Sequence, residues 1–207
     1  MQSKAHWERV YETKPTDAVS WFQVHADLSL QMIRQTGVDR TAAIIDVGGG
    51  ASTLVDDLLA AGYDNLTVLD LSSAALAAAS RRLGSVRSAK VGWVEANITE
   101  VELPVHAYDV WHDRAVFHFL TTPDERARYV QAVLRAVKPA GHVIVATFAE
   151  DGPSQCSGLP VVRYQADELH AEFGSGFDLV RHEKEAHHTP FGTQQQFVYC
   201  YCRKLVV

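Results

Sequence analysis

Residues 44–54 of the chain read Ile44-Ile45-Asp46-Val47-Gly48-Gly49-Gly50-Ala51-Ser52-Thr53-Leu54. The apolar run at the start has the length of a buried strand, and an amphipathic stretch from Ser52 to about Ala61 has the pattern of a helix. Glycines are needed where a chain reverses sharply or where backbone must approach a ligand closely. The N–H groups that begin a helix favour an electron-rich ligand. The stretch therefore predicts a strand, a tight turn and a helix that form a ligand site.

Two acidic residues refine this site. Asp46 lies at the end of the first strand, where its carboxylate disfavours a pyrophosphate and suits a ligand that carries an ammonium or hydroxyls. A second short strand, Leu66–Asp70, also ends in an acid, twenty residues after Gly50. A doubly wound sheet brings a carboxylate to a ribose at that spacing. A glycine triplet alone can be an ordinary turn, and Asp70 is what favours a ligand site.

The fourth expected strand ends in a polar stretch. Tyr108–His112 continues into Asp113 and Arg114, and His118 follows between two phenylalanines. Residues at the carboxyl end of a central strand face the crevice where open α/β sheets bind ligands. Alternatively, Asp113 and Arg114 form a local charge pair, and the histidines satisfy backbone groups.

Strands and helices alternate along most of the chain, which predicts a doubly wound α/β fold. The N-terminal residues 4–22 carry several aromatics and form either a helix packed on the sheet or a lid over the site. A Gly-, Pro- and Ser-rich loop is expected at 150–164. We expect helices at 26–36, 52–61, 74–83, 124–137 and 166–173, and strands at 42–47, 66–70, 91–94, 108–112, 142–148, 177–184 and 195–203.

Composition limits the classes of function. With 207 residues, of which 47% are hydrophobic, the chain has material for one well-buried domain. A net charge of −6 and the absence of a basic stripe argue against nucleic-acid binding. The sequence shows no apolar run long enough for a membrane span and no signal-peptide core, so we expect a cytoplasmic protein. Cys200 and Cys202 would share a strand face without a bridge, and no spacing of ligands predicts a metal site.

Three motifs resemble the cofactor-binding motifs of class I S-adenosylmethionine-dependent methyltransferases. They are Asp46-Val47-Gly48-Gly49-Gly50, Val68-Leu69-Asp70-Leu71 and Glu95-Ala96-Asn97-Ile98. His112 to Leu120 lies where this family has its fourth motif. The resemblance implies a single domain, 1–207, with an N-terminal helical cap at 1–37 and a Rossmann-like core at 38–207. It also implies helices on both faces of a seven-stranded sheet of order 3-2-1-4-5-7-6, with the last strand antiparallel.

The resemblance also implies a cofactor site for S-adenosylmethionine. Asp70 would hold the ribose hydroxyls, Leu71 and Ile98 would flank the adenine, and the carbonyl oxygen of Asn97 would accept from the adenine amine. Tyr11 and Trp21 of the cap would close over the methionine end of the cofactor. The expected cofactor-binding residues are Asp46, Gly48, Gly49, Gly50, Asp70, Leu71, Ala96, Asn97, Ile98, His112, Tyr11 and Trp21.

The expected reaction is methyl transfer to a small-molecule acceptor. A protein-lysine methyltransferase is the alternative, and a nicotinamide-dependent oxidoreductase or a non-catalytic binding protein is favoured less. Asp113 or His118 would accept a proton, and Arg114 would offer a cation to a polar acceptor. The acceptor site would be walled by residues 112–118, by the loop 152–164 with Arg163 and Tyr164, and by the turn around His188. Arg163 could instead pair with Asp167 or Glu168.

Overall fold

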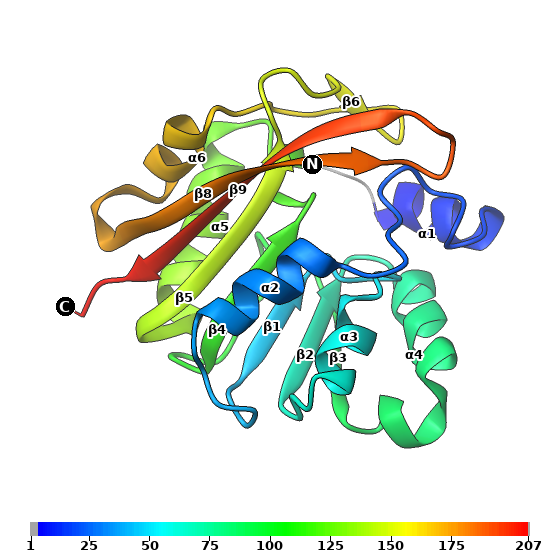
Figure 1. The fold of residues 1–207 in the computed structure, drawn as a ribbon, viewed down its shortest axis with the longest axis horizontal. Coiled ribbons are helices and arrows are strands. Elements are labelled where there is room, and N and C mark those ends of the chain that lie inside the picture. The colour runs from blue at the N-terminus through cyan, green and yellow to red at the C-terminus, as the bar shows by residue number, and fades with distance from the viewer. Residues whose placement is uncertain (1–3, 207) are drawn as a thin grey trace.

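The computed structural model describes residues 4–206, and its centre is a seven-stranded sheet (Figure 1). The sheet contains β1 (Ile44–Val47), β2 (Leu66–Asp70), β3 (Val91–Glu95), β4 (Tyr108–Arg114), β5 (Val137–Phe148), β8 (Phe177–His188) and β9 (Gln194–Lys204). Their order is β3-β2-β1-β4-β5-β9-β8. The strands from β3 to β5 are parallel, and β9 is antiparallel to both of its neighbours. The expected order, with the last strand antiparallel, is confirmed.

Helices cover both faces of this sheet, as the sequence predicts. One face carries α1 (Lys4–Thr13), α2 (Asp27–Gln35), α3 (Leu54–Ala60) and α4 (Ser73–Ser88), and the other carries α5 (Pro123–Ala136) and α6 (Ala166–Phe173). Successive strand residues alternate between the faces, so Ile44 packs with the first group of helices and Ile45 with the second. Both faces of the central strands are buried, which explains their continuous apolar runs. The expected segments 1–37 and 38–207 are described from residue 4 to residue 206, since residues 1–3 and 207 lie outside the described part.

The fourth strand extends further than its sequence pattern indicates. It was expected to end at His112, but Asp113 and Arg114 also pair with β5, opposite Val145 and Ala146. Because side chains alternate along a strand, Asp113 points to the opposite face from His112 and Arg114. Asp113 was expected to face the same crevice as His112 and Arg114. The extension of β4 places it on the other face of the sheet.

The expected long loop between β5 and α6 contains a small hairpin. Its strands are β6 (Gln155–Cys156) and β7 (Leu159–Pro160), joined by a turn at Ser157 and Gly158. Both turn residues have positive φ, at 51° and 76°. The hairpin folds back toward α1, where the side chains of His6 and Ser157 lie 3.3 Å apart. It therefore brings the 150–164 segment to the N-terminal helix.

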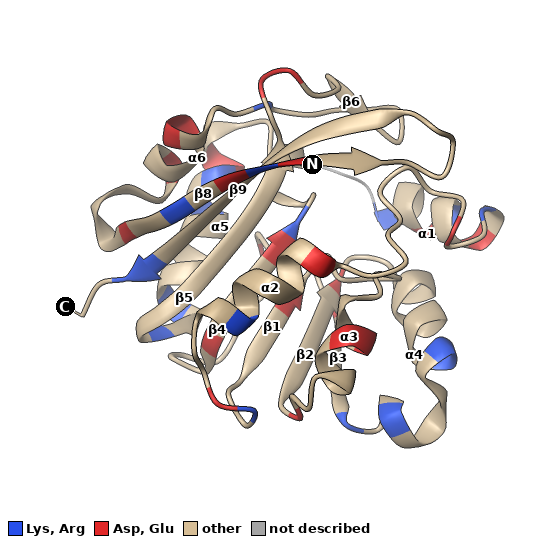
Figure 2. Ribbon diagram, in the orientation of Figure 1, with Lys and Arg blue, Asp and Glu red and all other residues tan. Residues whose placement is uncertain are grey.

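Charged residues of both signs are distributed over the fold (Figure 2). Along the edge strand β8, for example, acidic and basic residues alternate in the stretch Arg181 to Glu185. Cys200 and Cys202 are free and buried on one face of β9, as expected. Within residues 4–206, no helix is both long and apolar enough to cross a bilayer.

The helix α5 offers a test of how the chain encodes its helix ends. Thr122 accepts from the N–H of Glu125 at 3.3 Å, and the Glu125 carboxylate accepts from the N–H of Thr122 at 3.1 Å. We expect Thr122→Ala to lower the free energy of unfolding by about 1 kcal/mol, because the N–H of Glu125 loses its acceptor. Urea denaturation measures this loss. Thr121→Ala, at the exposed preceding position, is the matched control, and an equal loss in both variants would contradict the role of the cap.

Candidate functional site

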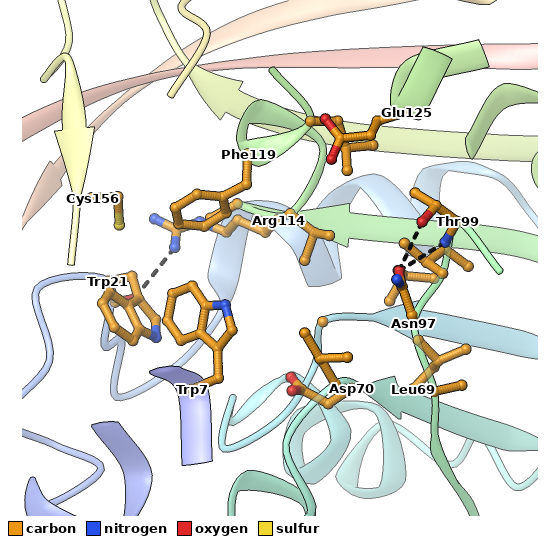
Figure 3. A pocket seen from close by; sticks show the side chains of 18 of the residues that line it. Trp7, Trp21, Leu69, Asp70, Asn97, Thr99, Arg114, Phe119, Glu125 and Cys156 are labelled. Carbon is orange, nitrogen blue, oxygen red and sulfur yellow. Dashed lines mark hydrogen bonds between the residues drawn. The ribbon is translucent and has the colours of Figure 1, made fainter. Parts of the chain in front are cut away.

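A cavity opens at the carboxyl ends of β1, β2 and β4, beneath α1 and the segment that follows it (Figure 3). It encloses about 880 Å³, including the space at its open mouth. We call it the main cavity. One end is lined by Asp70, Leu71, Ala96, Asn97 and Ile98, and the other end by Trp7, Tyr11, Trp21, Arg114, Phe119 and Cys156.

A second, smaller cavity of about 560 Å³ adjoins the first on the side of α2. We call it the side cavity. Its lining includes Asp46, Gly49 and His112, and Gly48 and Arg114 line both cavities. Of the residues expected to bind a cofactor, all except Gly50 line one of these two cavities.

The glycine loop makes room for two carboxylates. A Cβ at Gly49 would lie 2.4 Å from Oδ2 of Asp46, and a Cβ at Gly50 would lie 2.5 Å from Oδ2 of Asp70. Gly48 has a φ of 69°, which favours glycine over other residues. Gly50 lines neither cavity. Because it has no side chain, it leaves the space that the Asp70 carboxyl group occupies at the main cavity.

Asp70 ends β2 at the rim of the main cavity. Its Oδ1 accepts from the N–H of Ser72 at 2.8 Å, which orients the carboxyl group. Burial, together with the nearby Asp46 carboxylate, raises the pKa of Asp70 to about 7. A carboxyl group held in this way is suited to accept hydrogen bonds from ligand hydroxyls.

Asp46 contributes a buried carboxyl oxygen that lacks a partner. Its Oδ1 lies 2.7 Å from Nδ1 of His112, whereas Oδ2 has no hydrogen bond within the described residues. A buried acceptor without a donor is costly, so this oxygen fits a donor supplied by a ligand. The second ring nitrogen of His112, Nε2, lies 2.9 Å from Oγ of Ser29. The ring of His112 is therefore held on both sides, by Asp46 at Nδ1 and by Ser29 at Nε2.

Asn97 uses its carbonyl oxygen within the protein. The Oδ1 atom accepts from the N–H of Thr99 at 3.1 Å and from its hydroxyl at 2.9 Å (Figure 3). This is the oxygen that the resemblance implies as the acceptor for the adenine amine. With Oδ1 engaged, Nδ2 is the polar atom of Asn97 that remains to contact a ligand, and it would act as a donor.

Aromatic side chains form the other end of the main cavity. Trp7 contacts Phe119 and Trp21 edge to face, with ring centroids 5.2 and 5.8 Å apart, and Tyr11 lies 6.4 Å from Trp21. Tyr11 and Trp21 were expected here. Phe119 and Cys156 were not, because their positions depend on the short η1 helix (Phe117–Phe119) and on the β6–β7 hairpin, which have no strong sequence pattern.

Arg114 lies between the two cavities with its guanidinium largely buried. Nη2 donates to Glu185 at 3.0 Å, Nε donates to the hydroxyl of Tyr199 at 3.1 Å, and Nη1 donates to the carbonyl of Trp21 at 3.3 Å. The guanidinium also lies over the ring of Phe197, 4.1 Å from its centroid. These contacts fix a positive charge at the aromatic end of the main cavity.

Asp113 lies outside both linings. It is fully buried on the opposite face of β4 and accepts from the N–H groups of Val116 and Phe117 at 2.9 and 3.1 Å. The hydroxyl of Tyr129 donates to it at 2.6 Å. Burial raises the pKa of Asp113 to about 7. Because of the strand alternation, Asp113 holds the segment after β4 in place and does not face the cavities.

His118 also lies outside the two linings. It is fully buried, and its Nδ1 accepts from the N–H of Phe148 at 3.3 Å. Burial and the nearby charge of Arg114 lower the pKa of His118 to about 3. The imidazole is therefore neutral at physiological pH, and its contacts anchor η1 to β5.

The remaining expected acceptor residues lie away from the cavities. Arg163 donates to the carbonyl of Gly152 at 3.3 Å, and Tyr164 packs against Phe117. His188 lies at the exposed end of β8, next to Gln194. The loop still contributes to the main cavity, but through Cys156. Among the residues that the structure describes, no group of three or more His, Cys, Asp or Glu side chains could hold a metal ion.

Comparisons with known proteins agree with this geometry. Residues 45–143 match the family model of a methyltransferase domain. The bovine eEF1A lysine and N-terminal methyltransferase is 23% identical over 139 residues, which are 67% of this chain and 19% of that protein. The chain therefore spans about a fifth of this relative's length.

Solved structures share the fold at low sequence identity. A structure from work on the conversion of a disulfide bond into a thioacetal group during echinomycin biosynthesis has a TM-score of 0.76 at 16% identity, and the match covers 99% of this chain and 92% of that one. The Burkholderia thailandensis 1,6-didemethyltoxoflavin-N1-methyltransferase, with bound 1,6-didemethyltoxoflavin and S-adenosylhomocysteine, has a TM-score of 0.71 at 19% identity, and the match covers 98% and 87%.

The site passes a chemical test for S-adenosylmethionine. The cofactor carries ribose hydroxyls and an ammonium group, and the cavities offer the Asp70 carboxyl and the unpartnered Oδ2 of Asp46. These features, the strand order and the match of residues 45–143 favour a methyltransferase over the nicotinamide-dependent alternative. The chain carries a methyltransferase domain over residues 45–143, and its fold and site are consistent with the class I S-adenosylmethionine-dependent methyltransferases.

Proposed function

We propose that this enzyme methylates a small molecule that binds in the aromatic end of the main cavity. The observation that carries the proposal is the enclosure of this end by the chain's own segments. Trp7 and Tyr11 come from α1, Trp21 from the segment after it, and Cys156 from the β6–β7 hairpin. An acceptor in this space is surrounded by aromatic surface, which is typical of small-molecule sites.

The cofactor occupies the opposite end in this proposal. Asp70 accepts from the ribose hydroxyls, and Leu71 and Ile98 flank the adenine. Gly48 and Gly49 admit the methionine portion toward the side cavity, and Oδ2 of Asp46 accepts from the ammonium. When bound, S-adenosylmethionine supplies a methyl group on a sulfonium centre, which needs no further activation.

The protein's own task is to position the acceptor and exclude water. Bringing two reactants together in a fixed geometry contributes several powers of ten to a rate. Trp7, Trp21 and Phe119 supply rigid walls, and Arg114 supplies N–H donors for an oxygen of the acceptor. We place Arg114 at the acceptor, and leave Asp113 and His118 as supports of the cavity wall.

A protein-lysine acceptor is the second candidate, and the name of the bovine relative supports it. The chemistry of the aromatic end disfavours it, because the Arg114 guanidinium, which is paired with Glu185, presents N–H donors to the cavity and no acceptor for an ammonium. The α1 helix also lies over the cavity that a protein substrate would have to reach.

The first prediction concerns the ribose carboxylate. Asp70→Ala removes charge-assisted hydrogen bonds that are each worth about 1.5–3 kcal/mol, so the Kd for S-adenosylhomocysteine should rise at least about tenfold. Isothermal titration calorimetry measures this change. The control is Asp64→Ala at an exposed position before β2. An unchanged Kd in Asp70→Ala would remove Asp70 from the cofactor site.

The second prediction concerns pH. The pKa of Asp70 is raised to about 7, so the carboxyl group is protonated below that pH and accepts hydroxyl hydrogen bonds less strongly. The Kd for S-adenosylhomocysteine should therefore fall as the pH rises through about 7 and then level off. Asp70→Asn should remove this dependence while the protein stays folded. A wild-type Kd that does not change with pH would contradict the assignment.

The third prediction concerns the acceptor. With methyl-labelled S-adenosylmethionine, the enzyme should label a compound in a protein-free metabolite extract. Arg114→Gln should lower this labelling by roughly tenfold and change the Kd for S-adenosylhomocysteine less, since the acceptor loses a charged donor whereas the cofactor has no direct contact with Arg114 in this proposal. Arg163→Gln, which changes an arginine outside the cavity, is the control. Label found only in protein bands of a lysate would favour the lysine alternative.

A further inference from the structure

A continuous chain of buried hydrogen bonds runs along the wall of the side cavity and ends at Arg114, which lines both cavities. Oδ1 of Asp46 lies 2.7 Å from Nδ1 of His112, and Nε2 of His112 lies 2.9 Å from Oγ of Ser29. Oγ of Ser29 lies 3.1 Å from the hydroxyl of Tyr199, which accepts from Nε of Arg114 at 3.1 Å. Four of these residues are at most 3% exposed, and the side chain of Arg114 is 9% exposed. Neither Ser29 nor Tyr199 belongs to a motif identified in the sequence.

The chemistry of the two end groups fixes the donor at one end and the acceptor at the other. A guanidinium only donates and a carboxylate only accepts, so Arg114 donates into the chain and Asp46 accepts from it. Burial raises the pKa of Tyr199 to about 12, so its hydroxyl keeps the proton. Ser29 lies 3.1 Å from this hydroxyl, and the Glu185 carboxylate, which also accepts from it, lies at 3.4 Å. Ser29 thus joins the Tyr199 hydroxyl to Nε2 of His112.

The Asp46 carboxylate determines which atom of His112 carries the hydrogen that faces it. Because a carboxylate only accepts, Nδ1 of His112 donates to Oδ1 of Asp46, and the bond between Nε2 and Ser29 holds the ring in this orientation. The Oδ1 atom is then engaged, and Oδ2 is the oxygen left for a ligand in the side cavity. The hydroxyls of α2 and β9 thus control the orientation of a carboxylate in β1.

We propose that Ser29 and Tyr199 are positioning residues for the amino-acid end of the cofactor, which they act on through His112 and Asp46. The inference rests on the proposed contact between Oδ2 of Asp46 and the ammonium of the cofactor. It does not depend on the identity of the acceptor. It predicts that loss of either hydroxyl weakens the part of cofactor binding that involves the ammonium and leaves the adenosine part intact.

The test compares two ligands that share the adenosine group. S-adenosylhomocysteine carries the amino-acid group, and 5′-methylthioadenosine lacks it. In the full chain, Tyr199→Phe and Ser29→Ala should each raise the Kd for S-adenosylhomocysteine about three- to tenfold, as expected for one hydrogen bond. The Kd for 5′-methylthioadenosine should change by less than about twofold. Both hydroxyls act in one chain. The Kd of the double variant for S-adenosylhomocysteine should therefore be close to that of the single variant that binds less tightly.

Tyr201→Phe is the matched control. Tyr201 lies two residues further along β9, and its hydroxyl is 2.8 Å from Nδ1 of His142, outside this chain. Its removal should change neither Kd. Unchanged binding of S-adenosylhomocysteine in both test variants would overturn the inference, and so would an equal loss for the two ligands, which indicates a structural role. Asp70→Ala separates the proposals, because its loss of binding would support the cofactor site even if the positioning role failed.

Discussion

The pairing of β1 with β4 sets Asp46 beside His112, and much of the site depends on this contact. Both side chains are almost fully buried, and burial of a carboxylate is costly without hydrogen-bond partners. His112 supplies a partner for one oxygen, and the glycine loop leaves space for the other. A side chain at Gly49 would collide with that oxygen. The strand register and the glycine loop therefore both serve to accommodate the buried Asp46 carboxylate.

The N-terminal helix is held over the cavity by a second polar contact. Glu8 of α1 accepts from the N–H groups of Ser73 and Ala74 at 2.7 and 3.1 Å, at the start of α4. These N–H groups have no partner within their own helix, so a carboxylate from another element stabilises them. The preceding residue, Ser72, donates its N–H to Asp70. The position of the aromatic residues on α1 is thus tied to the turn that orients the Asp70 carboxyl group.

Sequence patterns predicted the helices and strands of this fold better than they predicted which face of the sheet each polar side chain occupies. The strand Leu66–Asp70 and the helix Ala166–Phe173 have the expected bounds, because their patterns and flanking residues are local. The extension of β4 depends on pairing with β5, which lies far along the chain, and it reversed the side on which Asp113 was expected. Ser29 and Tyr199 come from α2 and β9, so no local motif could have joined them to Asp46. Likewise, the contact of Cys156 with the cavity required the hairpin that follows β5.

The charged groups around the main cavity differ between its two ends. Asp70 lies at one end, Asp46 lies in the adjoining side cavity, and Arg114 lies at the opposite, aromatic end. The two carboxyl groups favour a cationic ligand beside them, and burial strengthens this preference because water screens the charges less. The guanidinium favours an acceptor that places oxygen or partial negative charge at the far end. In the proposed function, the carboxyl groups would take the cationic cofactor, and the N–H donors of Arg114, which is paired with Glu185, would take an oxygen of the acceptor at the far end.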